Sequence, residues 1–250
     1  MDLKRHTLLD ITDHGRYAIL AELAGCGPES DMLRERYAQI LLPKAAGARV
    51  PAIARREEGP LRPGFIPVGF SAPMIGREGR LRVAAFVREE DITRATSPYE
   101  LLALLTAPPR NVCNRALASA RVQAQALGLA IGVWGSAALE LYTGLPCTHK
   151  DSDLDLLVAA APREILSGFL YEIASIEAHL GLRIDVELEL ANGYGVHLKE
   201  LFGRGLTVLG KSINDVVLLP RKQVLAELPQ EESLHIRAVT GSQHGRATPG

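Results

Sequence analysis

Three aspartates occupy alternate positions in the segment CTHKDSDLDLLV, at the point where an apolar run begins. The run LDLLVAA, which starts at Leu154, has the composition of a β-strand. Residues two apart on a strand share a face, so we expect Asp153 and Asp155 to project together. Asp151, the first of the three, belongs to the preceding turn. Two carboxylates this close repel each other unless a positive charge lies between them.

A second predicted strand, LRIDVELEL at 182–190, alternates strictly between apolar and acidic residues. If it lies beside the first strand, Asp185 or Glu187 adds a third carboxylate to the pair. We interpret Glu189 as part of a solvated strand face. Clustered carboxylates, with no histidine or cysteine at ligand spacing, suit a hard cation such as Mg²⁺.

Gly135 and Ser136 lie where the apolar run LAIGVW at 129–134 gives way to a short helical stretch. The first N–H groups of a helix and the positive end of its dipole bind anions, and glycine lets a phosphate approach closely. We therefore expect Gly135 and Ser136 to receive a phosphate group. Lys150, just before the aspartates, and Lys211, in VLGKS, are candidate cations that would balance its charge.

The elements around these residues predict an α/β architecture. Ser97, followed by a proline and by Glu100, has the pattern of a helix start with a capping box. Further helices are predicted over 111–127 and 163–180. The order helix, strand, Gly-Ser, helix, strand, helix, strand predicts a mixed sheet flanked by helices in a domain covering residues 96–228.

The segments outside this domain differ in composition. Residues 1–95 are rich in glycine and proline, which predicts a smaller β-rich module of short strands and turns, with one strand near 81–87. Arginines outnumber acids between 49 and 82, which indicates either a solvated loop face or a docking surface for an acidic partner. These arginines are Arg49, Arg55, Arg56, Arg62, Arg77, Arg80 and Arg82. Residues 229–250 have little apolar periodicity, and we expect a flexible tail there.

The bulk properties exclude several classes of protein. The chain has 250 residues, 47% of them hydrophobic, which is enough for one large core or two smaller ones. A net charge of -1 gives no support for nucleic-acid binding through overall charge. The 3 cysteines fit neither a disulfide framework nor a metal motif. Since no stretch has the design of a secretory signal or the roughly 18 apolar residues of a membrane span, we expect a cytoplasmic protein with no membrane partner.

Three short motifs resemble the signature of the nucleotidyltransferase superfamily, which has the polymerase-β-like fold. They are VWGS at 133–136, SDLDLL at 152–157 and RIDVEL at 183–188. The resemblance implies a nucleotidyltransferase-type mixed sheet in which Asp153, Asp155 and Asp185 are catalytic. It also implies that these acids hold two Mg²⁺ ions, with Mn²⁺ as an alternative, and it favours Asp185 over Glu187 as the third ligand.

The longer string WGSAALELYTGLPCTHKDSDLDLLV at 134–158 is similar to a narrower family, the phosphoribosyl-dephospho-CoA transferases of malonate decarboxylase systems, also called holo-acyl-carrier-protein synthases. The likeness is close over about 130–190 and looser elsewhere. It implies transfer of a prosthetic group from 2'-(5''-triphosphoribosyl)-3'-dephospho-CoA to a serine of the acyl-carrier subunit, with release of diphosphate. Gly135, Ser136, Lys150 and Lys211 would then contact the triphosphate.

Two other interpretations stay open. A related nucleotidyltransferase would transfer a nucleotide to a small molecule, a tRNA or a protein hydroxyl, and would work with nucleotides alone or require RNA. A catalytically inactive copy of the fold, used as a binding module, would show no Mg²⁺-dependent turnover. Such modules often lose the carboxylates, which are intact in this chain.

Overall fold

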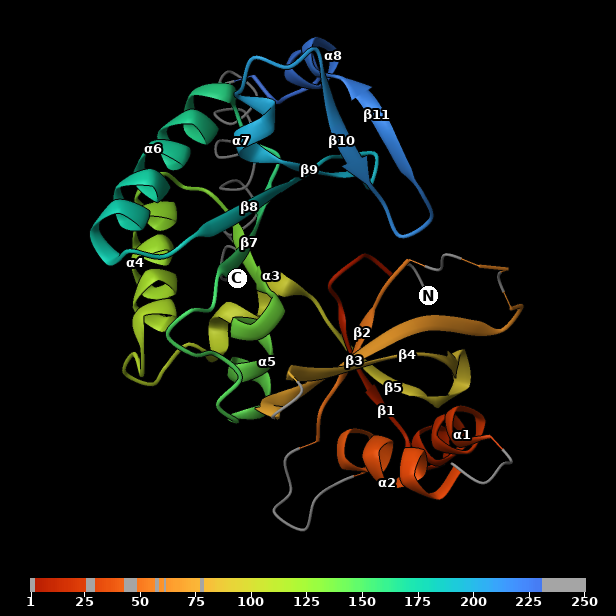
Figure 1. Ribbon diagram of the computed structural model, residues 1–250. Coiled ribbons are helices and arrows are strands. Elements are labelled where there is room, and N and C mark those ends of the chain that lie inside the picture. Colours follow the sequence, from red (N-terminus) through yellow and green to blue (C-terminus); the bar gives the residue numbers. More distant parts are fainter. Residues whose placement is uncertain are drawn as a thin grey trace, which may run out of the picture.

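The computed structural model of the chain describes residues 3–25, 30–42, 49–56, 59–60, 62–76 and 79–230, without the side chains of 30, 32–33, 72–76 and 79–80. These residues form two modules, each built on its own β-sheet (Figure 1). The predicted β-rich N-terminal module and the predicted mixed sheet flanked by helices are confirmed. From residue 231 onward, the predicted tail lies outside the described residues.

The N-terminal module has an antiparallel sheet with the strand order β4-β3-β2-β1-β5. Its strands are β1 (Leu8–Ile11), β2 (Ala52–Ala54), β3 (Phe65–Gly76), β4 (Gly79–Arg88) and β5 (Ile92–Thr96), and the 3-10 turn η1 (Glu89–Asp91) joins the last two. The predicted strand at 81–87 is therefore confirmed as part of β4. Helices α1 (Asp13–Ala24) and α2 (Ser30–Leu41) pack together against β3 and β4 (Figure 1).

Strand β1 contributes to the cores of both modules. Successive side chains on a strand point to opposite faces, so Leu8 and Leu9 must enter different environments. Leu9 packs among the buried residues of the N-terminal module, whereas Leu8 belongs to the core of the second module, and both are almost fully buried. The N-terminal sheet is thus covered by α1 and α2 on one face and contacts the second module with the other.

A buried arginine holds the N-terminal module together. Arg16 on α1 is only 1% exposed, and its guanidinium donates hydrogen bonds to three carbonyl oxygens. These acceptors are Ile11 at 3.3 Å, Leu41 at 2.9 Å and Val50 at 2.9 Å. Because the three acceptors lie at the end of β1, the end of α2 and just before β2, one side chain fixes how the helices meet the sheet.

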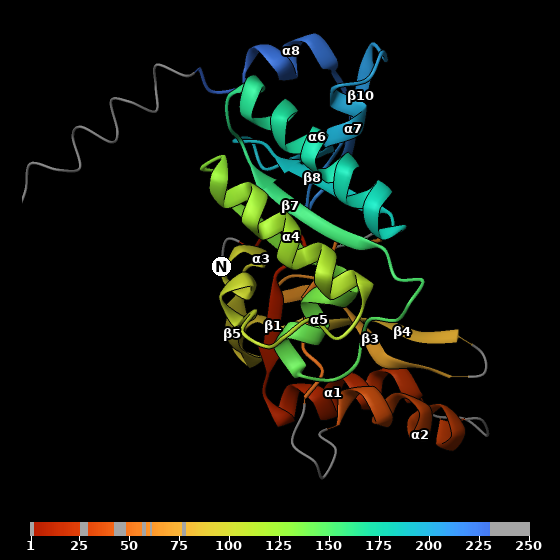
Figure 2. The same ribbon diagram turned by 90° about the vertical axis from the view of Figure 1, so that its left-hand side faces the viewer.

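The second module, which we call the C-terminal module, has the strand order β11-β10-β9-β8-β7-β6. Its strands are β6 (Ile131–Trp134), β7 (Leu154–Ala159), β8 (Ile184–Glu189), β9 (Gly195–His197), β10 (Thr207–Lys211) and β11 (Val216–Pro220). Its helices are α3 (Pro98–Leu101), η2 (Leu102–Leu104), α4 (Val112–Ala126), α5 (Gly135–Thr143), α6 (Arg163–Leu180), α7 (Leu198–Leu201) and α8 (Arg221–Ala226). Only β7 and β8 pair in parallel, and α6 makes the crossover between them. Figure 2 shows α4 and α6 side by side in front of these strands.

The local signals in the sequence mark the ends of these helices. Ser97 caps α3 in a full capping box with Glu100, as predicted. Helix α6 begins at Arg163 and ends at Leu180. The next residue, Gly181, adopts the left-handed conformation and closes the helix, as predicted. Strands β9 to β11 extend the sheet beyond the predicted elements. Within the described part of the chain, no helix is long and apolar enough to cross a membrane.

We predict that replacing Arg16 by methionine lowers the free energy of unfolding by about 3 kcal/mol, because buried carbonyl oxygens lose their donors. Urea denaturation of the full chain measures this loss. Arg34→Met is the matched control, since Arg34 is an exposed residue of the neighbouring helix α2 and its replacement is expected to cost less than about 0.5 kcal/mol. Equal effects of the two substitutions would contradict the structural role of Arg16.

Candidate active site

Two of the predicted acids meet where β6, β7 and β8 lie side by side. Asp155 on β7 is in register with Asp185 on β8 and with Trp134 on β6. In-register residues of paired strands project from the same face, so the two carboxylates are neighbours. The alternate residues of both strands, including Leu154 and Ile184, are fully buried on the other face. The expected pairing of the two acidic strands is therefore present.

Gly135 lies directly against the Asp155 carboxylate. It begins α5 with a φ of +67°, and a Cβ atom at this position would overlap the Oδ2 atom of Asp155. Only glycine satisfies both constraints, since it tolerates positive φ and has no side chain. Ser136 follows in the same helix, and both residues line one cavity together with Asp155. The Gly-Ser and Asp-x-Asp motifs, separate in sequence, thus meet in space.

Asp155 is the most electrostatically strained of the acids. Burial, followed by repulsion from Asp185 and Asp153, raises the pKa of its carboxyl group to about 7. Asp153 itself is exposed at the residue before β7. A cation bound among these carboxylates would offset the repulsion.

Asp185 is held by two basic side chains. Arg183 donates to both of its carboxylate oxygens, at 3.0 and 2.5 Å, and the Nε2 atom of His197 lies 3.4 Å from Oδ1. Burial opposes ionisation of Asp185, but the bonds from Arg183 and His197 outweigh it and lower the pKa of this carboxyl group. Asp185 is therefore a carboxylate at neutral pH. The i, i+2 spacing of Asp185 and Arg183, which lies just before β8, is a signal that the sequence carries, whereas nothing local points to His197.

Glu187, the alternative third acid, is engaged by the N-terminal segment. Arg5 donates to Glu187 at 2.8 Å, and the His6 ring nitrogen lies 3.5 Å away. Burial works against ionisation, but His6, Arg5 and Lys211 together lower the pKa of Glu187. The His6 ring also stacks on Trp134, with 4.0 Å between ring centroids. The charge of Glu187 is thus balanced by Arg5 near the start of the chain. Asp185 is the acid that lies in register beside Asp155.

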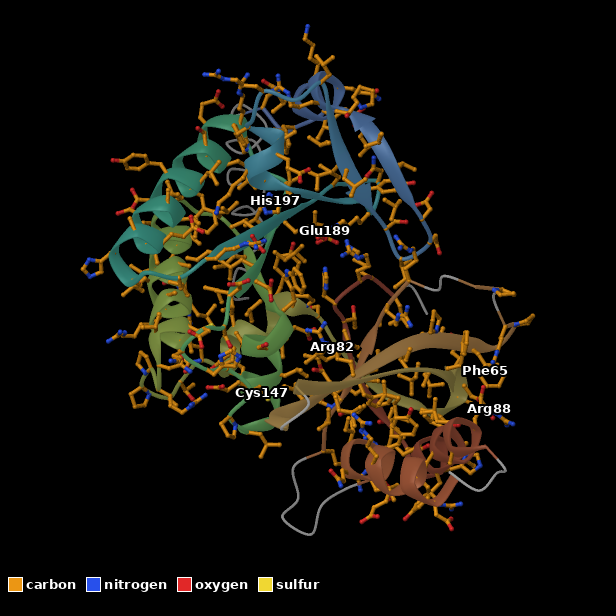
Figure 3. All side chains as sticks on the ribbon, in the orientation of Figure 1. Phe65, Arg82, Arg88, Cys147, Glu189 and His197 are labelled. Carbon is orange, nitrogen blue, oxygen red and sulfur yellow. The ribbon has the colours of Figure 1, made fainter. Side chains whose placement is uncertain are left out.

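The interpretation of Glu189 as part of a solvated face is wrong. Its side chain is only 17% exposed. Lys4 forms an ion pair with it at 2.6 Å, and the Tyr99 hydroxyl donates a hydrogen bond at 2.8 Å. Figure 3 labels Glu189 and His197 on the strands that face the N-terminal module. The start of the chain and α3 cover the acidic face at this position, which alternation alone does not reveal.

The three predicted acids can be compared with the needs of a divalent cation. Within the described residues, no group of three or more His, Cys, Asp or Glu side chains is arranged to hold a metal ion. Asp185 is bonded instead to Arg183, whose side chain is 65% exposed and has room to turn away. The oxygen-only set of Asp153, Asp155 and Asp185 has the chemistry that Mg²⁺ prefers. The chemistry of the three acids thus suits a cation, while Asp185 is bonded to Arg183 in this structure.

Two cavities meet at the paired acids. The first, which we call the inter-module cavity, has a volume of about 560 Å³ and is lined by Asp155, Gly135 and Ser136 on one side and by the N-terminal sheet on the other. The second, the sheet cavity, has a volume of about 630 Å³ and is lined by Asp185 and neighbouring residues of β8 to β10. Trp134 lines both. The two carboxylates therefore stand at the boundary between two cavities.

The two predicted lysines lie in different surroundings. Lys211 lines the sheet cavity at the end of β10, near Arg5, which donates to its carbonyl oxygen. Lys199 lines the same cavity and was not predicted. Lys150 is exposed on the turn before β7 and lines neither of the two cavities.

The arginines between 49 and 82 do not share one environment. Arg49 forms an ion pair with Asp13 at 3.0 Å and Arg62 with Glu22 at 2.5 Å, so both pack onto helix α1. Arg55 and Arg82 line the inter-module cavity instead. Arg77 and the side chain of Arg80 lie outside the described residues. Docking of an acidic partner on this segment stays a prediction.

Comparisons with known proteins give a consistent family. The model of the phosphoribosyl-dephospho-CoA transferase MdcG N-terminal domain matches residues 4–98, and that of the MdcG C-terminal domain matches residues 100–222. The phosphoribosyl-dephospho-CoA transferase of Xanthomonas axonopodis pv. citri is 36% identical over 184 residues, 74% of this chain and 85% of that protein. Proteins of the same name from Bradyrhizobium diazoefficiens (30% identical, 89% of this chain, 92% of that protein) and Pseudomonas aeruginosa (33% identical, 81% and 97%) also match. A comparison with solved structures found no match.

The two glycines that flank α5 provide a matched test of the contact with Asp155. Gly135 and Gly144 have φ of +67° and +68°, but a Cβ atom at Gly144 would meet nothing within 4 Å. Alanine at either position pays about 1 kcal/mol for the left-handed conformation. We predict that Gly135→Ala costs a further 1–3 kcal/mol or so, because its methyl group displaces Asp155.

Urea denaturation measures both costs. The excess cost of Gly135→Ala should disappear when Asp155 is also replaced by alanine, because the overlap is then removed. Equal losses for Gly135→Ala and Gly144→Ala in the otherwise unchanged chain would show that Gly135 does not support the carboxylate.

Proposed function

The chain belongs to the phosphoribosyl-dephospho-CoA transferase family, and on this premise we propose that it transfers a phosphoribosyl-dephospho-CoA group to a serine of the acyl-carrier subunit of malonate decarboxylase. The proposed donor is 2'-(5''-triphosphoribosyl)-3'-dephospho-CoA. The serine oxygen forms a bond to the α-phosphorus of the donor, and the bond from this phosphorus to the bridging oxygen breaks. Diphosphate leaves with the electron pair, and the hydroxyl proton passes to a base.

One observation supports this proposal above the others: the in-register pair of Asp155 and Asp185 stands between two cavities. A direct phosphoryl transfer brings the attacking and leaving oxygens to one phosphorus from opposite sides. In our proposal the inter-module cavity holds the donor triphosphate beside Gly135 and Ser136. The sheet cavity receives the serine of the carrier beside Asp185.

The residues of the sheet cavity suit an acceptor hydroxyl carried by an acidic protein. In this proposal Asp185 orients the serine hydroxyl and takes its proton. Arg183 and His197 lower the pKa of Asp185 before substrate binds, and a bound cation would keep it ionised after Arg183 has turned away. Lys211 lines the same cavity and supplies positive charge, whereas Lys199 forms an ion pair with Glu177 at 2.7 Å. Attraction between opposite charges speeds the encounter of two proteins and favours the correct orientation.

We propose that Asp153, Asp155 and Asp185 hold the divalent cations of the reaction, Mg²⁺ with Mn²⁺ as the alternative. When bound, such cations neutralise the charge of the triphosphate and lower the pKa of the attacking hydroxyl. Glu187 is the weaker candidate for third ligand, since Arg5 already forms an ion pair with it. Arg183, whose side chain is 65% exposed, would turn away from Asp185 when the cations bind.

Intact mass spectrometry of the carrier tests the proposed reaction. The full chain, Mg²⁺, an apo acyl-carrier subunit and the triphosphoribosyl donor should together produce a carrier that is heavier by the phosphoribosyl-dephospho-CoA group. Asp155→Asn and Asp185→Asn should each slow this transfer by roughly a hundredfold or more. Asp151→Asn is the matched control, because Asp151 is an exposed residue of the turn, and it should keep the wild-type rate.

Wild-type activity of the Asp155→Asn variant would contradict this mechanism. A carrier that gains mass from ATP alone would favour the related nucleotidyltransferase that transfers a nucleotide. No mass gain with any donor would favour the inactive binding module.

Cation binding has a readout that does not depend on turnover. We expect Mg²⁺ to raise the thermal midpoint of the wild-type chain at about pH 8, where most Asp155 carboxyls are ionised, because binding to the folded state stabilises it. Asp155→Asn and Asp185→Asn should shift the midpoint much less, and Asp151→Asn should respond like the wild type. The same shift in all four proteins would place the cation elsewhere.

A further inference from the structure

The inter-module cavity has one wall that the catalytic motifs do not explain. Asp155, Gly135 and Ser136 form its C-terminal wall, and the opposite wall comes from the N-terminal sheet. This second wall includes two arginines, Arg55 just after β2 and Arg82 on β4. Among the described residues that line the cavity, Asp155 is the one acid. Two guanidinium groups therefore share a cavity with the strained carboxylate.

The β-sheet register places both arginines over the same part of β3. Ser71 pairs with Arg82 across β3 and β4, and Gly69, two residues away on the same face, pairs with Ile53 of β2. A Cβ atom at Gly69 would lie 3.7 Å from the Cδ atom of Arg55, so the Arg55 side chain extends across this glycine. Because residues two apart share a strand face, Arg55 and Arg82 project from one side of the sheet.

Arg88 has different surroundings from Arg82. Arg88, on the same strand as Arg82, forms an ion pair with Glu90 at 3.2 Å and lies over the Phe65 ring. Figure 3 shows Arg82 on the side of the module that faces the catalytic sheet and Arg88 at the far end of the strand. Arg82 and Arg88 therefore lie in different surroundings although they belong to one strand.

We propose that Arg55 and Arg82 bind the phosphates of the donor triphosphate, the part that leaves as diphosphate. This inference rests on the proposed function and assigns part of the substrate site to the N-terminal module. Guanidinium groups bind phosphate oxygens in paired hydrogen bonds and stay charged throughout the reaction. Opposite Gly135 and Ser136, they would neutralise the charge that builds up on the leaving group. The cavity volume of about 560 Å³ is within the range of ligand sites.

Binding of inorganic tripolyphosphate to the full chain tests this site without any turnover. Isothermal titration calorimetry should show that Arg55→Ala and Arg82→Ala each weaken tripolyphosphate binding by about tenfold, and that Arg82→Lys keeps part of it. Arg88→Ala is the matched control on the same strand and should bind like the wild type. Circular dichroism melts of each variant would separate a loss of binding from a loss of folding.

Steady-state transfer to the apo carrier gives a second readout. Arg82→Ala should raise the KM for the triphosphoribosyl donor about tenfold or more and leave the KM for the carrier unchanged. Wild-type transfer with an unchanged donor KM in both arginine variants would overturn the inference and leave the proposed function intact. If the wild type transfers nothing but tripolyphosphate binding still depends on Arg55 and Arg82, the phosphate site stands and the proposed function fails.

The position of the phosphates can also be tested against the sheet cavity. Tripolyphosphate binding that survives in the Arg55→Ala, Arg82→Ala double variant and is lost in Lys211→Ala would place the phosphates beside β10. That result would overturn the inference.

Discussion

The repulsion between the neighbouring carboxylates of Asp155 and Asp185 is the interaction on which the rest of the site depends. Two half-buried acids in register on adjacent strands are costly unless positive groups surround them. Arg183 and His197 both contact the carboxylate of Asp185 and lower its pKa. Asp155 differs, because its burial and the repulsion from Asp185 raise its pKa. A cation would therefore stabilise the site most if it bound beside Asp155. This arrangement is the basis on which we propose that the site binds substrate phosphates together with metal ions.

The N-terminal module completes this site and does not simply precede it. Arg5 forms an ion pair with Glu187, His6 stacks on Trp134 between the two cavities, and Leu8 of β1 joins the C-terminal core. The Tyr142 hydroxyl on α5 adds a hydrogen bond of 2.6 Å to Asp10 on β1. The segment that leads into β1 therefore fixes the N-terminal sheet against the strands that carry Asp155 and Asp185. This contact creates the inter-module cavity and brings arginines within reach of it.

The sequence predicted the elements whose signals are local. The capping box at Ser97, the apolar periodicity of α6 and the alternation on β7 and β8 depend on near neighbours, and each is present. The crossover through α6 makes β7 and β8 parallel neighbours, which is why Asp155 and Asp185 could be paired in advance. Helix α1 was missed because its buried face includes Arg16 in place of a continuous apolar stripe.

The features that were not predicted depend on contacts between distant segments. The alternation on β8 correctly separated apolar from acidic residues. It could not predict that Tyr99 and Lys4 contact Glu189 and shield it from solvent. Likewise, no local pattern distinguishes Arg82, which lines the cavity, from Arg62, which pairs with helix α1. Burial and charge on one strand face are set by the element that packs on it, and this information lies elsewhere in the chain.

The most direct test of this account is a crystal structure of the full chain with Mn²⁺ and the triphosphoribosyl donor. We expect anomalous peaks for Mn²⁺ beside Asp153, Asp155 and Asp185, and the triphosphate in the inter-module cavity. The side chain of Arg183 should have left Asp185. A triphosphate bound in the sheet cavity, or Mn²⁺ bound away from the three acids, would contradict the division of the site into a donor cavity and an acceptor cavity.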